Sequence, residues 1–227
     1  MNSILSIFID ELGNFNMHDH HGALYGFCLV LHDQSAPINE HLDKLHASLT
    51  SSGYDASLPL HTAPIIRMKD PYDTMDREER RVVFNKFFNC AKRLPIKYKT
   101  FIFEKDLFDT KMQLIAKMIM SLKEFIEANR DVFSKYSLVR IYYDNGQQEI
   151  SSMIHSVFNE YFDKFVEFKK ALPSQYRLLQ VADLFCTLEA IEYKRMKENV
   201  NKSEIDFFVS MNKFKKTYLR SIRSLSF

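Results

Sequence analysis

Four carboxylates occupy positions where a folded chain rarely leaves a charge unpaired. Asp10 and Glu11 follow directly on the apolar run ILSIFI, and Asp144 ends the run LVRIYY. Asp183 lies inside RLLQVADLFCTLEAI, whose apolar residues point in nearly every direction around a helix. A helix that is apolar all round is buried, and a buried carboxylate without a partner is strongly unfavourable. Each of these acids therefore needs a compensating group.

Asp183 belongs to a narrow polar stripe on this buried segment. Gln180, Asp183 and Thr187 fall at positions i, i+3 and i+7, which share one face of a helix. A cap, a lysine or a backbone group would satisfy the carboxylate, and so would a metal ion. The stripe alone leaves these alternatives open.

The strand-end acids suggest what chemistry a metal ion would perform. Functional groups of an α/β sheet collect at the carboxyl ends of its strands. If the strands that end at Asp10 and Asp144 are neighbours, their carboxylates repel each other unless a cation or a shared proton intervenes. Mg²⁺ prefers such oxygen ligands, and two ions about 4 Å apart can activate water for phosphodiester hydrolysis. Glu11 points to the opposite side of the strand, so Asp10 is the better candidate ligand.

The apolar pattern predicts the elements that position these acids. Strands are expected over 4–10, 23–32, 96–106, 137–144 and 164–169. Helices are expected over 37–49, 75–94, 107–135, 147–162 and 175–200, with two shorter ones around 203–211 and 214–224. SLPLHTAPIIR is expected to be extended, because Pro59 and Pro64 disfavour a helix. This order predicts an α/β fold whose mixed sheet has antiparallel first strands and then alternates strands with helices.

Length and composition indicate one intracellular domain. The 227 residues carry a formal net charge of +2, and we expect a single domain over 1–227 with a helical insertion at about 35–95 and a helical tail at about 200–227. Three widely spaced cysteines without a C-x-x-C pair are typical of reduced thiols (Cys28, Cys90 and Cys186). No signal peptide is evident, and no apolar run approaches the roughly 20 residues of a membrane helix. We therefore expect a cytoplasmic protein with no membrane partner.

The tail NKFKKTYLRSIRSLSF combines an apolar helix face with basic residues. Such a segment can dock on the core, mediate oligomerisation or contact nucleic acid. Docking is the default expectation.

Four segments resemble one known family. FIDELG resembles the DESG motif that opens the domain of unknown function 3800 family, which has a ribonuclease H-like fold. LVRIYYDNGQ is similar to its second acidic strand, LPLHTAPIIR to its central His-containing segment, and LLQVADLFCTLEAIEYKR to its Q-x-A-D helix. The resemblance runs from Ile4 to about Arg195 in the same order, and the Q-x-A-D helix is its most specific part.

The resemblance implies a ribonuclease H-like sheet with a metal-binding triad and several assisting residues. The triad is Asp10, Asp144 and Asp183, with Mg²⁺ or Mn²⁺ as the metal. Glu11 would be the neighbouring acid. The residues that would support the ligands or contact the substrate are Gln180, His61 and Asn145. His61 would serve as an acid or base, although a hydrogen-bonded core histidine explains it equally well.

The chain departs from the family pattern at two positions. Leu12 replaces the small serine of DESG, and Pro64 stands where similar proteins often carry a glutamate. A fourth carboxylate from that segment is therefore missing. Glu104 or Asp106 is a candidate replacement.

Two other motifs suggest metal sites less strongly. The loop MHDHHG contains three histidines, and such a loop is more often an exposed turn (His18, His20 and His21). Glu167-x-Lys169 downstream of Asp144 supplies the ingredients of another metal nuclease class, but the triplet is common and a helix is expected in between. No phosphate-binding glycine loop or G-x-S-x-G elbow is present.

Two functions follow as hypotheses. The first is a metal-dependent nuclease that hydrolyses phosphodiester bonds of DNA or RNA. The second is a ribonuclease H-like module that binds nucleic acid or regulates without catalysis. Oligomerisation through the C-terminal helices is compatible with both.

Overall fold

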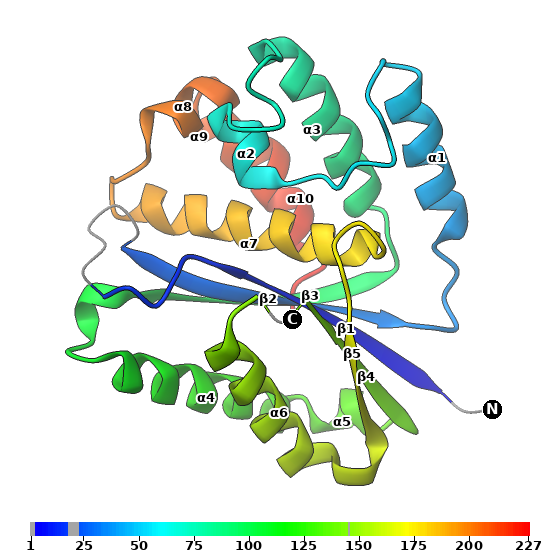
Figure 1. Ribbon diagram of the computed structural model, residues 1–227, viewed down its shortest axis with the longest axis vertical. Coiled ribbons are helices and arrows are strands. Elements are labelled where there is room, and N and C mark those ends of the chain that lie inside the picture. The colour runs from blue at the N-terminus through cyan, green and yellow to red at the C-terminus, as the bar shows by residue number, and fades with distance from the viewer. Residues whose placement is uncertain (1–2, 18–22, 145) are drawn as a thin grey trace.

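The computed structural model describes residues 3–17, 23–144 and 146–227. A five-stranded sheet in the order β3-β2-β1-β4-β5 forms its centre, with helices on both faces (Figure 1). The strands are β1 (Ile4–Leu12), β2 (Leu24–Asp33), β3 (Ile96–Glu104), β4 (Leu138–Tyr143) and β5 (Val166–Lys170). β1, β2 and β3 pair antiparallel, whereas β4 pairs parallel with β1, and β5 with β4. The predicted α/β class and mixed sheet are therefore confirmed.

The helices form a layer on each face of the sheet (Figure 1). One layer contains α1 (Asn39–Thr50), α2 (Thr62–Arg67), α3 (Arg77–Ala91), α7 (Arg177–Met196), α8 (Lys202–Phe208), α9 (Met211–Phe214) and α10 (Arg220–Arg223). The other contains α4 (Lys111–Ala128), α5 (Arg130–Phe133) and α6 (Gln148–Phe162). A short π-helix over Lys215–Leu219 joins α9 to α10. No helix in the described ranges combines the length and apolarity needed to cross a bilayer.

Alternation along β1 supplies both apolar cores. Ile7 and Ile9 pack into the core beneath α4 and α6, whereas Phe8 packs into the core beneath α7. β1 also runs further than predicted, because Glu11 and Leu12 still pair with β2. The period of two therefore sends the Asp10 and Glu11 side chains to opposite faces of the sheet.

The segment 57–67 was expected to be extended throughout, and this prediction is wrong for its second half. Residues Thr62–Arg67 form α2, and His61 precedes it in an extended conformation. Pro64 is the third residue of this helix, where a backbone N–H has no intrahelical acceptor and its loss is harmless. The helix predicted over 107–135 is also shorter, since α4 ends at Ala128 and α5 begins at Arg130.

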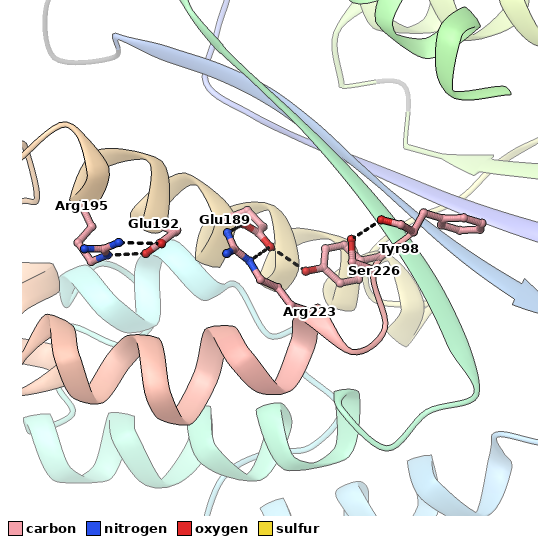
Figure 2. A network of polar contacts seen from close by, with 7 residues as sticks. Tyr98, Glu189, Glu192, Arg195, Arg223 and Ser226 are labelled. Carbon is pink, nitrogen blue, oxygen red and sulfur yellow. Dashed lines mark hydrogen bonds and ion pairs between the residues drawn. The ribbon is translucent and has the colours of Figure 1, made fainter. Parts of the chain in front are cut away.

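The C-terminal tail docks on the sheet edge and on α7, as its amphipathic pattern predicts (Figure 2). The Tyr98 N–H donates to the Leu225 carbonyl at 3.1 Å, and the Phe227 N–H donates to the Tyr98 carbonyl at 3.2 Å. Arg223 pairs with Glu189 of α7 at 3.1 Å, and the Tyr98 hydroxyl donates to the same carboxylate at 2.8 Å. The tail thus covers part of the edge of β3.

A buried ion cluster anchors α2 between α7 and α8. The Glu204 side chain is fully buried and accepts from Arg67 of α2 at 3.1 Å and from Lys194 of α7 at 2.8 Å. Arg80 of α3 donates to the carbonyls of Ile65 and Ile66 at the end of α2. These contacts hold the short helix in place on α7.

Removing the charge of Glu204 tests this anchor. Glu204→Gln leaves Arg67 and Lys194 without their carboxylate partner, so we expect the free energy of unfolding to fall by roughly 2–4 kcal/mol. Urea denaturation followed by circular dichroism measures the loss. The matched control is Glu40→Gln at the exposed Glu40–Lys44 pair, where a change below about 0.5 kcal/mol is expected. Equal effects of the two substitutions would contradict an anchoring role.

Candidate functional site

Asp10, near the carboxyl end of β1, and Asp144, directly after β4, lie at the same end of two neighbouring parallel strands. The β1–β4 register pairs Phe8 with Tyr142, and each acid lies two residues beyond that pair. The strands that carry Asp10 and Asp144 are therefore neighbours, which is the condition that the sequence inference required. It rests on the parallel pairing of β1 with β4, since parallel strands end on the same side.

Asp10 lies among like charges on the α7 side of the sheet. Burial raises its pKa well above the ordinary value, and the negative charges of Asp183, Glu11 and Asp144 raise it further. Cys28 is the register partner of Asp10 on β2, and burial raises the pKa of its thiol. The surroundings of Asp10 therefore disfavour its charged form unless a cation is present.

Asp183 has a backbone partner from the segment that begins α2. The Thr62 N–H donates to Oδ2 at 2.7 Å, and the Thr187 hydroxyl donates to Oδ1 at 3.3 Å. Burial raises the pKa of Asp183, while the Thr62 N–H and the charge of nearby His61 lower it. A backbone group thus compensates part of the burial, which is one of the alternatives that the polar stripe left open.

Gln180 binds the segment before α2 to the face of α7 that also carries Asp183. It is 3% exposed. Its Oε1 accepts from the Leu60 N–H at 2.9 Å and from Arg177, and its Nε2 donates to the Pro173 carbonyl at 2.5 Å. Both polar atoms are engaged inside the protein, so Gln180 positions the segment that satisfies Asp183.

Glu11 lies on the α6 side of the sheet. Its Oε1 accepts from the Tyr143 hydroxyl at 3.1 Å and from the Gln147 side-chain amide at 3.3 Å, whereas its Oε2 is buried with no partner among the described residues. Burial and the charge of Asp144 raise the pKa of Glu11 to about 7 despite these two hydrogen bonds. A buried oxygen without a donor is an energetically unfavourable feature that a cation or proton would relieve.

Gly146 lies between the carboxylates of Glu11 and Asp144. Its N–H donates to Asp144 Oδ1 at 2.8 Å. A Cβ at this position would lie 3.0 Å from Glu11 Oε1 and 3.1 Å from Asp144 Oδ1. The absence of a side chain therefore allows the two carboxylates to approach the same point.

The turn after β1 is held by contacts that the sequence did not reveal. Gly13 has φ of 91°, in the left-handed region that favours glycine. Its carbonyl accepts from Gln147 at 3.1 Å, and the buried Lys105 donates to the Asn16 carbonyl at 2.7 Å. Leu12 packs against the α7 core, so the residue that departs from the DESG motif is accommodated within the strand.

The remaining candidates divide into those near the carboxylates and those elsewhere. His61 lies close enough to Asp183 to affect its pKa, and its backbone N–H donates to the Tyr72 hydroxyl at 3.2 Å. Asn145 and the three loop histidines lie outside the described residues (His18, His20 and His21).

The two proposed replacements for the missing carboxylate do not occupy that role here. Glu104 accepts from Tyr193 at 2.8 Å and pairs with Lys197 at 3.0 Å, near the far end of α7 from Asp183. Asp106 is exposed in the turn that follows β3. Neither side chain has a contact with the other acids among the described residues.

The Glu167-x-Lys169 triplet is also separated from Asp144. Glu167 pairs with Arg140 at 2.9 Å and lies opposite it in the β4–β5 register. Arg140 precedes Asp144 by four residues, which is roughly 13 Å along a strand. The alternative nuclease arrangement is therefore not assembled in this structure.

The donor chemistry of the site suits a hard cation, although its side chains are not gathered into a chelate. Within the described part of the chain, no group of three or more His, Cys, Asp or Glu side chains is arranged to hold a metal ion. Carboxylate oxygens are the ligands that Mg²⁺ and Mn²⁺ prefer. A cation would relieve the mutual repulsion around Asp10, and it would give Glu11 Oε2 the partner that it lacks among the described residues.

Comparison with known proteins provides no relative from which to assign the site. No family model matches the chain, and neither a curated protein nor a solved structure has significant similarity to it. Assignment of a function therefore depends on the geometry of the carboxylates and on the sequence motifs.

The raised pKa of Glu11 predicts a pH-dependent stability. Between the ordinary value of 4.5 and about 7, the folded state binds more protons than the unfolded state, so stability falls as pH rises through this window. Glu11→Gln should remove up to about 3 kcal/mol of that fall. Urea denaturation in a chelator at pH 5 and pH 8 measures the difference. Glu124→Gln, an exposed acid on α4, should keep the wild-type pH dependence, and an unchanged dependence in Glu11→Gln would contradict the prediction.

The hydrogen bond from the Thr62 backbone can be tested by proline substitution. Thr62 is the first residue of α2 and follows an extended residue, where proline is tolerated. Thr62→Pro removes the N–H that binds Asp183, so we expect the free energy of unfolding at pH 8 to fall by roughly 1–3 kcal/mol. Thr62→Ala retains the N–H and serves as the control. A similar loss in both variants would show that the backbone donor is not the cause.

Proposed function

We propose that this chain is a divalent-metal-dependent nuclease of ribonuclease H-like type, related to the domain of unknown function 3800 family. Its metal would be Mg²⁺ or Mn²⁺, held by Asp10, Asp144 and Asp183. The supporting observation is the placement of these acids on β1, after β4 and on α7, where burial and the negative charges of Asp183, Glu11 and Asp144 raise the pKa of Asp10.

The arrangement of the elements supports this proposal. Antiparallel first strands followed by alternating helices and strands is the order expected of a ribonuclease H-like sheet, and the five-stranded sheet has this order. The glutamine and the aspartate of the Q-x-A-D segment also bind the same stretch of chain. Gln180 and Asp183 accept from the Leu60 and Thr62 N–H groups of a single segment.

The residues of the site would have distinct roles. When bound, the divalent ions would activate a water and stabilise the leaving oxygen of a phosphodiester. Thr62 orients Asp183 through its N–H. Glu11, whose pKa is about 7, can hold or release a proton at Oε2 near neutral pH.

A catalytically inactive nucleic-acid-binding or regulatory module is the second candidate. Pro64 occupies the segment where similar proteins often carry a glutamate, and Glu104 is engaged by Tyr193 and Lys197. The missing fourth carboxylate favours this alternative. It would retain the fold and an affinity for metal or nucleic acid without cleavage.

Substitution of Asp183 tests the nuclease proposal. Asp183→Asn retains the shape of the side chain but removes its charge, so we expect divalent-dependent cleavage of DNA, RNA or hybrid substrates to fall at least about 100-fold. Circular dichroism should show a folded protein. Asp73→Asn, an exposed loop residue, should retain full activity. Unchanged cleavage in Asp183→Asn would refute the assignment.

Titration calorimetry with Mn²⁺ separates the two candidates. The nuclease should bind the ion and cleave at least one of the three substrates. Binding of Mn²⁺ without cleavage of any of them would favour the inactive module. Absence of Mn²⁺ binding would contradict the metal site itself.

A further inference from the structure

A recess beside the carboxylates has a chemistry opposite to theirs. It has a volume of 160 Å³ and lies between β4, β5 and α6. Its floor is apolar and aromatic (Ile141, Tyr143, Ile154 and Phe168). Its rim is polar and basic (Ser151, His155, Lys169 and Lys170). No Asp or Glu is among the described residues that line it.

Tyr143 connects this basic recess to the candidate site. Its ring contributes to the floor, and its hydroxyl donates to Glu11 at 3.1 Å. Lys170 is the register partner of Tyr143 on β5, and Asp144 follows Tyr143 in the chain. The recess is therefore the immediate neighbour of the carboxylates on the α6 face.

The two lysines of the recess, Lys169 and Lys170, are not fully neutralised by acidic partners. The Lys170 side chain is exposed and has no hydrogen bond or ion pair within the described part of the chain. Lys169 lies 3.7 Å from Glu167. The acid in the first turn of α6, Glu149, is paired with a different lysine, Lys111, at 2.7 Å. Positive charge thus remains available beside a cluster of acids.

The floor adds an aromatic surface to this charge. His155 is exposed and stacks on Phe168, with ring centroids 3.8 Å apart and planes 25° apart. Basic side chains next to aromatic faces are the combination with which proteins bind single-stranded nucleic acid. Phosphate contacts of this kind set the register of the strand and carry little sequence information.

We propose that the basic recess binds a backbone phosphate of a nucleic acid, next to the phosphodiester that faces the carboxylates. A polyanion repelled by Asp10, Glu11 and Asp144 needs a nearby cation in order to bind, and the fold places Lys170 there with no acidic partner among the described residues. The identity of the ligand as nucleic acid rests on the proposed function. The recess would direct the strand across the β4–β5 edge of the sheet.

Binding without cleavage provides the test. Fluorescence anisotropy of a labelled 12-nucleotide single strand, in chelator and over a series of salt concentrations, reports affinity when no metal is present. We expect Lys170→Ala to weaken binding about five- to tenfold and to reduce the slope of log affinity against log salt by about 0.7. Lys170→Arg should restore most of the affinity.

Lys117→Ala is the matched control, because Lys117 is exposed on α4 and has no ion pair in the described part of the chain. It removes the same charge away from the recess and should leave both affinity and slope unchanged. Equal weakening by the Lys117 and Lys170 substitutions would overturn the inference, since it would indicate a general charge effect. Failure of the wild-type protein to bind the oligonucleotide would overturn it as well.

Two further outcomes separate this inference from the nuclease proposal. Lys170-dependent binding by a protein that never cleaves would support the recess and reject the nuclease. Cleavage with a KM unaffected by Lys170→Ala would support the nuclease and reject the recess. Binding of inorganic phosphate that depends on Lys170, without oligonucleotide binding, would reject nucleic acid as the ligand.

Discussion

The hydrogen bond from the Thr62 N–H to Asp183 is the contact on which the site depends. It joins residues 121 apart in the chain, at 2.7 Å. Without it, a carboxylate on a buried helix face would lose its 2.7 Å hydrogen bond and keep the longer one that the Thr187 hydroxyl donates at 3.3 Å. Much of the surrounding structure holds its two partners together. Gln180 binds the Leu60 N–H, and the Glu204 cluster and Arg80 hold α2 from its other end.

The alternation of β1 gives the site its two sides. Asp10 faces α7 and the thiol of Cys28, whereas Glu11 faces α6, Tyr143 and Gln147. A single strand end thus supplies an acid to each face of the sheet. The α7 side has backbone donors and a nearby histidine, and the α6 side opens to the basic recess.

The acids lower the stability of the molecule that contains them. Burial raises the pKa of Asp10, Glu11 and Asp183, and like charges add to the effect for the first two. Packing offsets this penalty elsewhere, through an apolar core on each side of the sheet and a docked tail. Retention of so unfavourable a cluster is typical of functional sites.

The sequence by itself determined the elements and the positions of the acids along them. The apolar periodicity located all five strands and the long helices, and the buried helix around Asp183 could be identified because its apolar residues surround it. The alternation rule also placed Asp10 and Glu11 on opposite faces. These features depend on local pattern and on backbone geometry, so no tertiary information was required.

Only the tertiary structure decided which groups meet. The parallel pairing of β1 with β4 brought Asp144 beside Asp10, and the folding of 58–67 over α7 supplied the Thr62 donor. The extended conformation predicted around Pro64 was wrong, because proline breaks a helix interior but fits the first turn of a helix. Tyr143, Gln147 and Gly146 carried no signal of their own, since their roles arise from contacts with a strand more than a hundred residues earlier. Long-range pairing of this kind is set by the packing of the whole chain and is not encoded in the residues near each acid.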